Sequence, residues 1–193
     1  ALNFYVGEGD GVGTLTVRNG GRVEAVGDTA NLAVGSGEAS SGSVLVTGFD
    51  VATNARSTLH VDPSALGYLV VGWLGGTGSA QVTEGALLES NLADVGALGG
   101  TGDVLISGSG NALASRWENS EKLIVGQDGS GELHVEAGAF VSTKHLTIGE
   151  DPEGDGLVVV HGVGSEGLPS RLRVTESVAN FFVGSNGGHG ELR

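Results

Sequence analysis

A short hydrophobic pattern ending in glycine recurs seven times along the chain. It reads apolar, any residue, apolar, Gly, and its closing glycines are Gly7, Gly35, Gly72, Gly96, Gly126, Gly149 and Gly184. The intervals between these glycines are 28, 37, 24, 30, 23 and 35 residues, so short and long intervals alternate. Alternation of apolar residues over four or five positions, bounded by glycine, predicts a half-buried β-strand.

A second strand is predicted soon after each of these glycines. Its pattern is Gly, any residue, apolar, any residue, apolar, and it begins at Gly13, Gly42, Gly78, Gly102, Gly131, Gly156 and Gly190. A third, looser apolar element follows at Val23 and Ala25, Leu59 and Val61, Leu113, Phe140, and Leu172 and Val174. Three short strands per repeat predict an all-β, right-handed, single-stranded parallel β-helix of about seven coils. Each strand would pair with its copy in the next coil, about 4.8 Å away.

The repeats come in pairs, which we assign to one β-helix segment, residues 1–193. The pairs cover roughly 4–68, 69–122 and 123–180, and a further coil starts at 181–193. Because both ends fall inside a repeat and the chain contains no Met, we expect it to be a piece of a longer protein. The additional residues of the long units, Phe49–Arg56 and Ser165–Ser170, are expected to form surface loops. An antiparallel sandwich or propeller would need a regular blade of strands, which the alternating intervals do not fit.

The composition agrees with a β-rich chain and narrows its chemistry. Glycine, with 37 of 193 residues, disfavours helix, because it costs about 1 kcal/mol relative to Ala there. The chain has no Cys, which excludes disulfides and cysteine-based sites. Its net charge of −14 makes nucleic acid an unsuitable partner. No stretch approaches the roughly 20 apolar residues of a membrane span, so we expect no membrane insertion by this segment.

One block of the repeat resembles a known family. Leu123–Val135, followed by Gly138 and Val141, resembles the repeat of autotransporter passenger domains, and Phe4–Val23 carries the same block. The step Ser107–Asn111 is similar to the long member of that repeat, and the resemblance covers essentially the whole chain. It implies type V secretion through the outer membrane of a Gram-negative bacterium and display at the cell surface. Many such passengers are adhesins or self-association factors, and others use the β-helix as a stalk.

The outward positions of the first strand suggest an interaction surface. By parity they are Tyr5, Ala33, Val70, Asp94, Ile124, Thr147 and Phe182, and five of the seven are apolar. A contiguous exposed apolar stripe marks a contact surface. We therefore select Tyr5, Val70, Ile124 and Phe182 as partner-binding candidates. The alternatives are that a loop of a long coil covers this face, or that the side chains stack on one another.

The only two tryptophans complete the set of candidate binding residues. Trp73 directly follows a turn glycine and is expected at a corner, and Trp117 is the second aromatic of this kind. Such side chains stack on sugars or pack over a coil edge. The partner that we expect is a host-cell or matrix surface component, or a second copy of the chain.

A catalytic alternative rests on two carboxylates. Asp103 and Glu132 are predicted to stack in adjacent coils, which would raise one pKa or recruit a cation. A β-helix polysaccharide lyase uses such carboxylates to hold Ca²⁺, together with a Lys or Arg base. The nearest basic candidates, Arg116 and Lys122, are equally suited to ordinary surface ion pairs.

Other chemical motifs are missing from the sequence. There is no nucleophile elbow and no His-Glu-x-x-His, and the acidic run at 150–156 lacks the spacing of a calcium-binding loop. We therefore expect a non-enzymatic segment with no metal site, no cofactor and a role in adhesion or cell–cell self-association. A carbohydrate-active enzyme on the same fold and a passive stalk remain the alternatives.

Overall fold

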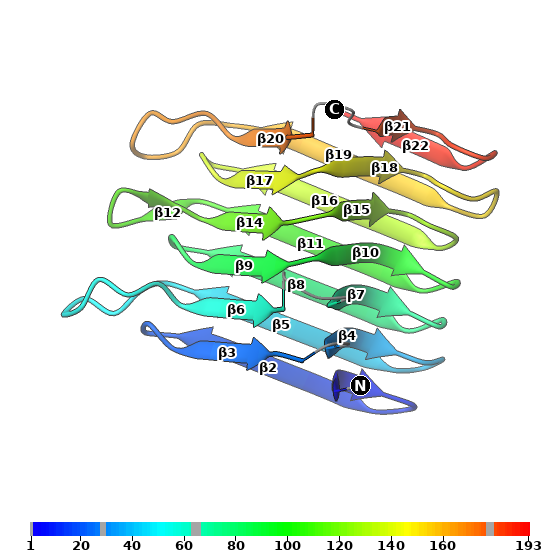
Figure 1. Ribbon diagram of the computed structural model, residues 1–193, viewed down its shortest axis with the longest axis horizontal. Helices are drawn as coiled ribbons and strands as arrows, with labels where there is room; N and C mark the ends of the chain where they lie inside the picture. Colours follow the sequence, from blue (N-terminus) through cyan, green and yellow to red (C-terminus); the bar gives the residue numbers. More distant parts are fainter. Residues whose placement is uncertain (1, 28–29, 63–66, 177–179) are drawn as a thin grey trace.

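The structure confirms the predicted parallel β-helix (Figure 1). The computed structural model describes residues 2–27, 30–62, 67–176 and 180–193. The coils stack from the N-terminal coil to the C-terminal one, and each of the first six contributes one strand to each of three parallel sheets. Among the described residues, no helix has the length and hydropathy to cross a membrane.

Three columns of strands form the walls of the solenoid. The first sheet contains β1 (Leu2–Glu8), β4 (Ala30–Ser36), β7 (Tyr68–Trp73), β10 (Leu92–Ala97), β15 (Lys122–Val125), β18 (His145–Ile148) and β21 (Phe181–Val183). The second contains β2 (Val12–Arg18), β5 (Ser41–Thr47), β8 (Thr77–Thr83), β11 (Thr101–Ser107), β16 (Ser130–Glu136), β19 (Asp155–His161) and β22 (His189–Leu192). The third contains β3 (Arg22–Ala25), β6 (Thr58–Val61), β9 (Leu87–Ser90), β14 (Arg116–Asn119), β17 (Phe140–Thr143) and β20 (Arg171–Val174).

Equivalent positions of the repeat lie opposite each other in neighbouring coils. Ala33, for example, pairs with Tyr5 on one side and with Val70 on the other. Inward columns therefore run through the stack and form one continuous apolar core, with Val34, Val71, Val95 and Val125 fully buried. Such stacking buries in the neighbouring coil the surface that a single coil would leave exposed.

The glycines of the first and second patterns bring two sheets into close contact. Gly72 has a φ of +76°, and a Cβ at this position would lie 2.6 Å from the nitrogen of Gly102 and overlap the carbonyl of Thr101. A Cβ at Gly102 would in turn overlap the carbonyl oxygen of Val71. Only glycine permits this approach, which explains why both patterns contain it.

The third sheet corrects the sequence prediction in three places. The third strand of the fourth coil is β14, whereas the predicted Leu113 lies in β13 (Leu113–Ala114), which pairs with β12 (Ser109–Gly110) in a small antiparallel loop. The strand β9 was not predicted from the sequence. Phe140 faces outward, and its neighbour Val141 is the buried residue.

The physical reason for these errors is a buried polar column. The second inward position of these strands is Ser90, Asn119 or Thr143, each of which is buried. Ser90 donates to Asn119 (2.8 Å), and the amide of Asn119 donates to the hydroxyl of Thr143 (3.0 Å). Because these hydrogen bonds satisfy the polar groups, a search for alternating apolar residues misses the column.

The loops of the long coils lie together at one corner, between the second and third sheets (left in Figure 1). The side chain of Asn111 donates to that of Asn54, and the hydroxyls of Ser109 and Ser165 lie 3.3 Å apart. Val51 in the first of these loops is 88% exposed. The prediction that the additional residues form surface loops is therefore confirmed.

Candidate functional site

The outward column of the first sheet is mostly buried, so the predicted exposed apolar stripe is wrong. Ala33 and Val70 are each 3% exposed and Ile124 is 7% exposed. The loop at 49–56 does not cover this face, because its backbone is bonded at the opposite corner through Gly48 and Ser57. Among the described residues, side chains of adjacent coils contribute to this burial, because they stack about 4.8 Å apart in such columns.

One part of this face is hollowed where a small residue stands between larger ones. Ala33 lies in register between Tyr5 and Val70, and the result is a hollow of about 180 Å³. We call it the outer hollow. It is lined by Asn3, Phe4, Tyr5, Asn31, Leu32, Ala33, Tyr68, Val70 and Trp73. Three of the predicted binding residues, Tyr5, Val70 and Trp73, are thus brought together.

Two amides and a second tyrosine join them. Asn3, Asn31 and Tyr68 lie opposite one another in the first three coils, two positions before the predicted column. The amide nitrogen of Asn31 donates to the side-chain oxygen of Asn3, at 3.1 Å. These three residues were not predicted from the sequence, although the outward parity, continued by two positions, points to them.

A buried carboxylate holds Tyr68 in place. The Tyr68 hydroxyl donates a hydrogen bond to Asp94, which is 2% exposed. Burial raises the pKa of Asp94 to about 6, while the Tyr68 hydrogen bond and the charge of Lys122 act in the opposite direction. Burial and the neighbouring Asp94 also raise the pKa of Tyr68. Both groups therefore favour their neutral forms more than they would in water.

This burial predicts that Asp94→Asn stabilises the protein above neutral pH. The contribution of the neutral Asp94 carboxyl to the stability of the folded protein is fully present below the ordinary pKa of 3.8. It is lost as the pH rises through about 6. The amide of Asn can still accept from Tyr68 without a buried charge. At pH 7.5 we expect the free energy of unfolding of the variant to exceed that of the parent by about 1–3 kcal/mol. At pH 4 we expect almost no difference between the two.

Urea unfolding followed by circular dichroism at the two pH values measures this difference. The control is Asp10→Asn, which removes the same charge at an exposed position. A gain at pH 7.5 that is no larger than the gain at pH 4 would contradict the prediction.

Beside the outer hollow, three apolar residues mark the edge where the first sheet turns into the second. Trp73 ends β7, and the next residue, Leu74, is 44% exposed. Leu98 occupies the same position one coil later, is 48% exposed, and accepts a hydrogen bond from the backbone of Gly75 (3.1 Å). We call Trp73, Leu74 and Leu98 the first-sheet edge. The repeated sequence Leu-Gly-Gly-Thr-Gly, at 74–78 and 98–102, is the signal that could have revealed it.

The two leucines adopt a backbone conformation that leucine disfavours. Leu74 has a φ of 52° and Leu98 a φ of 48°, both in the left-handed region. The corresponding turn of the seventh coil has Asn186, with a φ of 47°. Asparagine tolerates this region through its short polar side chain. Leucine at these positions therefore combines backbone strain with exposed apolar surface.

We predict that Leu74→Asn and Leu98→Asn each raise the free energy of unfolding, by about 0.5–1 kcal/mol. The reason is that Asn relieves the left-handed strain and removes exposed apolar area. Thermal unfolding of each variant measures the change. Val51→Asn is the matched control, since Val51 is exposed but has no positive φ. Destabilisation by both leucine variants would show that the packing of the leucine side chains stabilises the protein more than their backbone strain destabilises it.

The remaining predicted binding residues lie elsewhere. Ile124 is buried in the column between Asp94 and Thr147, and Phe182, 48% exposed, lies at the C-terminal end of the same column. Trp117 is 0% exposed, and its indole nitrogen donates to Ser90 at 2.9 Å. Trp117 is therefore a core residue of the third sheet, and its selection as a contact residue is corrected. Trp73 does stand at a corner, as predicted.

A polar hollow of about 200 Å³ lies on the outer face of the second sheet. Asp103 and Glu132 are opposite each other in adjacent coils, as predicted. His134 lies 3.4 Å from Glu132 and 3.6 Å from Glu136. Burial raises the pKa of Asp103, with His134 acting against it and Glu132 adding to it. Asp103, His134 and Glu136 line this hollow together with Ser79, Ala80, Gln81 and Leu105.

The basic groups of the lyase alternative belong to other faces. Arg116, on the third sheet, pairs with Glu118 at 3.3 Å, and Lys122, on the first sheet, pairs with Glu150 at 2.5 Å. Neither lines the polar hollow. Among the described residues, no group of three His, Asp or Glu side chains is placed to hold a metal ion. The two basic residues named for the lyase alternative are therefore not brought beside the stacked carboxylates.

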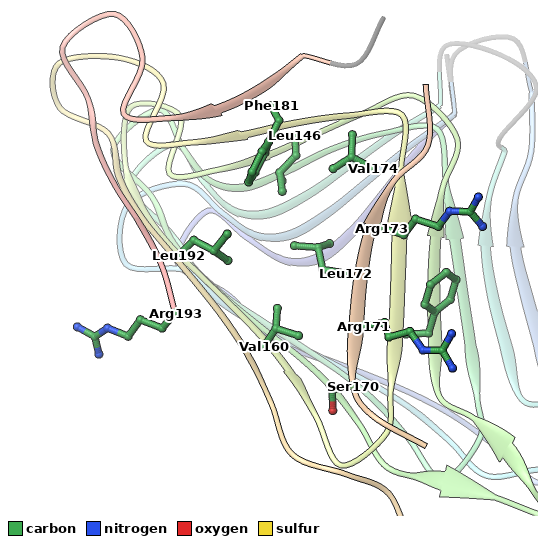
Figure 2. Close-up of a pocket in the computed structure, with 11 residues that line it drawn as sticks. Leu146, Val160, Ser170, Arg171, Leu172, Arg173, Val174, Phe181, Leu192 and Arg193 are labelled. Carbon is green, nitrogen blue, oxygen red and sulfur yellow. The ribbon is translucent and has the colours of Figure 1, made fainter. Parts of the chain in front are cut away.

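A cavity of about 760 Å³ lies at the C-terminal end of the stack (Figure 2). Leu146, Leu172, Val174 and Leu192 point into it, whereas Arg171, Arg173 and Arg193 point away (Figure 2). The inward residues continue the columns of the core. The cavity is therefore the open face of that core, without the convergent polar groups of a ligand site.

No protein-family model matches the chain, and no curated protein and no solved structure matches it. The chemistry of a candidate site therefore rests on the chain's own residues. Two adjoining features carry that chemistry on the first sheet: the outer hollow, which combines aromatic rings with amides, and the strained apolar first-sheet edge.

Proposed function

We propose that this chain is a segment of an autotransporter passenger that is displayed on the surface of a Gram-negative bacterium and mediates adhesion without catalysis. The first-sheet edge is the observation that carries the proposal. Its leucines are exposed and strained at positions where Asn186 shows a better-tolerated residue. Apolar residues kept at a local cost in stability indicate a contact surface.

The fold supports this proposal in a second way. Stacked coils give an extended surface on which equivalent positions repeat from one coil to the next. The polar hollow of the second sheet supports catalysis less well, because Arg116 and Lys122 are engaged elsewhere. A host-cell or matrix surface component is the partner class, and the export route follows from the resemblance of the repeat.

Adhesion of coated beads tests the proposal. Beads carrying the chain should adhere to epithelial cells or to matrix-coated glass. Beads carrying the Leu74→Asn, Leu98→Asn double variant should adhere at least tenfold less, since two contact residues together contribute about 2–4 kcal/mol. Val51→Asn, on the loop corner, should adhere like the parent. The double variant should be at least as stable as the parent, so misfolding cannot explain its loss.

Three outcomes would overturn the proposal. Parent beads that fail to adhere would favour a passive stalk. Loss of adhesion in Val51→Asn alone would move the contact to the long loops. Concentration-dependent association of the parent in sedimentation velocity, lost in the double variant and unaccompanied by adhesion, would make the first-sheet edge a self-association surface.

A further inference from the structure

We propose that the outer hollow binds a single neutral sugar residue of a surface glycan. This inference rests on the proposed adhesive function and names its ligand class. The site lies beside the first-sheet edge and shares Trp73 with it.

The shape of the hollow suits one sugar ring. Its volume of about 180 Å³ is too small for a folded partner and below the range of sites for drug-sized ligands, which starts at about 300 Å³. The hollow exists because Ala33 is the small member of its column, between Tyr5 and Val70. A compact ligand that protrudes from a larger molecule fits such a space.

The side chains of the hollow match both surfaces of a sugar. The rings of Tyr5, Tyr68 and Trp73 are half-buried and offer apolar faces, on which the C–H face of a pyranose stacks. Tyr68 is held by its hydrogen bond to Asp94, so its ring loses little freedom on binding.

The two amides supply directional contacts for hydroxyl groups. One N–H of Asn31 and the oxygen of Asn3 are used in their mutual hydrogen bond. Within the described part of the chain, the side-chain oxygen of Asn31 and the amide N–H groups of Asn3 have no other partner, so one acceptor and further donors are available to a ligand. Vicinal hydroxyls of a sugar bind this combination because each is both donor and acceptor.

Charge selects a neutral sugar over an anionic one. No Lys, Arg or His of the described residues lines the outer hollow, the buried carboxyl of Asp94 accepts a hydrogen bond from Tyr68, and the chain carries a net charge of −14. Sialylated or sulfated glycans would meet repulsion without a compensating cation.

A glycan array tests the assignment. The probes are immobilised oligosaccharides ending in glucose, galactose, mannose or N-acetylglucosamine, together with sialylated and sulfated forms. The parent should bind at least one neutral probe. Ala33→Ile, which fills the hollow with a residue that the column accepts at Ile124, should weaken that binding about tenfold or more. Thr147→Ile, which places the same side chain in the sixth coil of the column, should bind like the parent.

The outcomes separate this inference from the proposed function. Adhesion that depends on Leu74 and Leu98 without binding to any array glycan would overturn the sugar site and leave the adhesive function intact. Binding retained by Ala33→Ile, or confined to anionic probes, would also overturn it. Glycan binding by a parent whose beads do not adhere would support the sugar site and overturn adhesion. The emission of Trp73 should change on binding, whereas buried Trp117 should report only unfolding.

Discussion

Gly102→Ala is expected to destabilise the protein by about 3 kcal/mol, because the new methyl group has no space between two sheets. A Cβ on Gly102 would overlap the carbonyl oxygen of Val71 and lie 2.6 Å from the nitrogen of Gly96. Both obstacles are backbone atoms that are held in parallel sheets by their neighbours. The first and second sheets would have to separate over several coils to relieve the overlap.

Gly99→Ala is the matched control in the same turn. Gly99 has a φ of +73°, and a Cβ there would meet no atom within 4 Å. Its cost is therefore the left-handed strain alone, about 1 kcal/mol. Urea unfolding followed by circular dichroism measures both variants. Equal losses for Gly99→Ala and Gly102→Ala would show that conformational strain, not close sheet contact, explains the glycines of the repeat.

Trp117→Ala is expected to cost about 4 kcal/mol, as large-to-small changes of buried tryptophan do. Trp117 is the largest fully buried side chain of the described residues and stands in register between Leu88 and Val141. Its loss leaves a cavity in the middle of the core and removes a donor from the buried hydroxyl of Ser90. The coils on both sides lose packing at once.

Two further variants separate the contributions to this loss. Trp117→Phe keeps an aromatic ring but cannot donate to Ser90, so we expect a smaller loss of about 1–2 kcal/mol. Trp73→Ala, on the half-buried tryptophan of the outer hollow, should cost about 1 kcal/mol. Thermal and urea unfolding report all three. A Trp117→Ala variant that is as stable as Trp73→Ala would contradict the placement of Trp117 in the core.

The three sheets differ in how well the sequence predicts them. The first two sheets were predicted from spacing alone, because their inward positions are nearly all apolar and their boundaries carry glycine, as at Gly72 and Gly102. The third sheet was predicted only in part. In the third to fifth coils its second inward position holds Ser90, Asn119 and Thr143, which the buried hydrogen bonds between them make acceptable. A sequence pattern records polarity but not whether a polar group finds its partner.

The candidate site shows the same division. The parity of the sequence pattern is enough to place Tyr5 and Val70 in one outward column, and the turn glycine is enough to place Trp73 at a corner. Parity does not reveal that this column is buried, that Ala33 leaves a hollow in it, or that Leu74 has a positive φ. Burial depends on the sizes of neighbours in other coils, and equivalent positions of adjacent coils are 23 to 37 residues apart along the chain.

The sequence by itself determined the repeat, the parallel β-helix and the register of its coils, because a periodic pattern of apolar residues and glycines has only one way to stack with every core face buried. The tertiary structure alone decided which outward residues remain in contact with solvent. Only in the tertiary structure do Asn3, Tyr68 and Trp73 line one hollow, and only there does Trp117 lie in the core. The reason is that exposure and site shape arise from packing between coils, whereas the fold arises from the pattern within each coil.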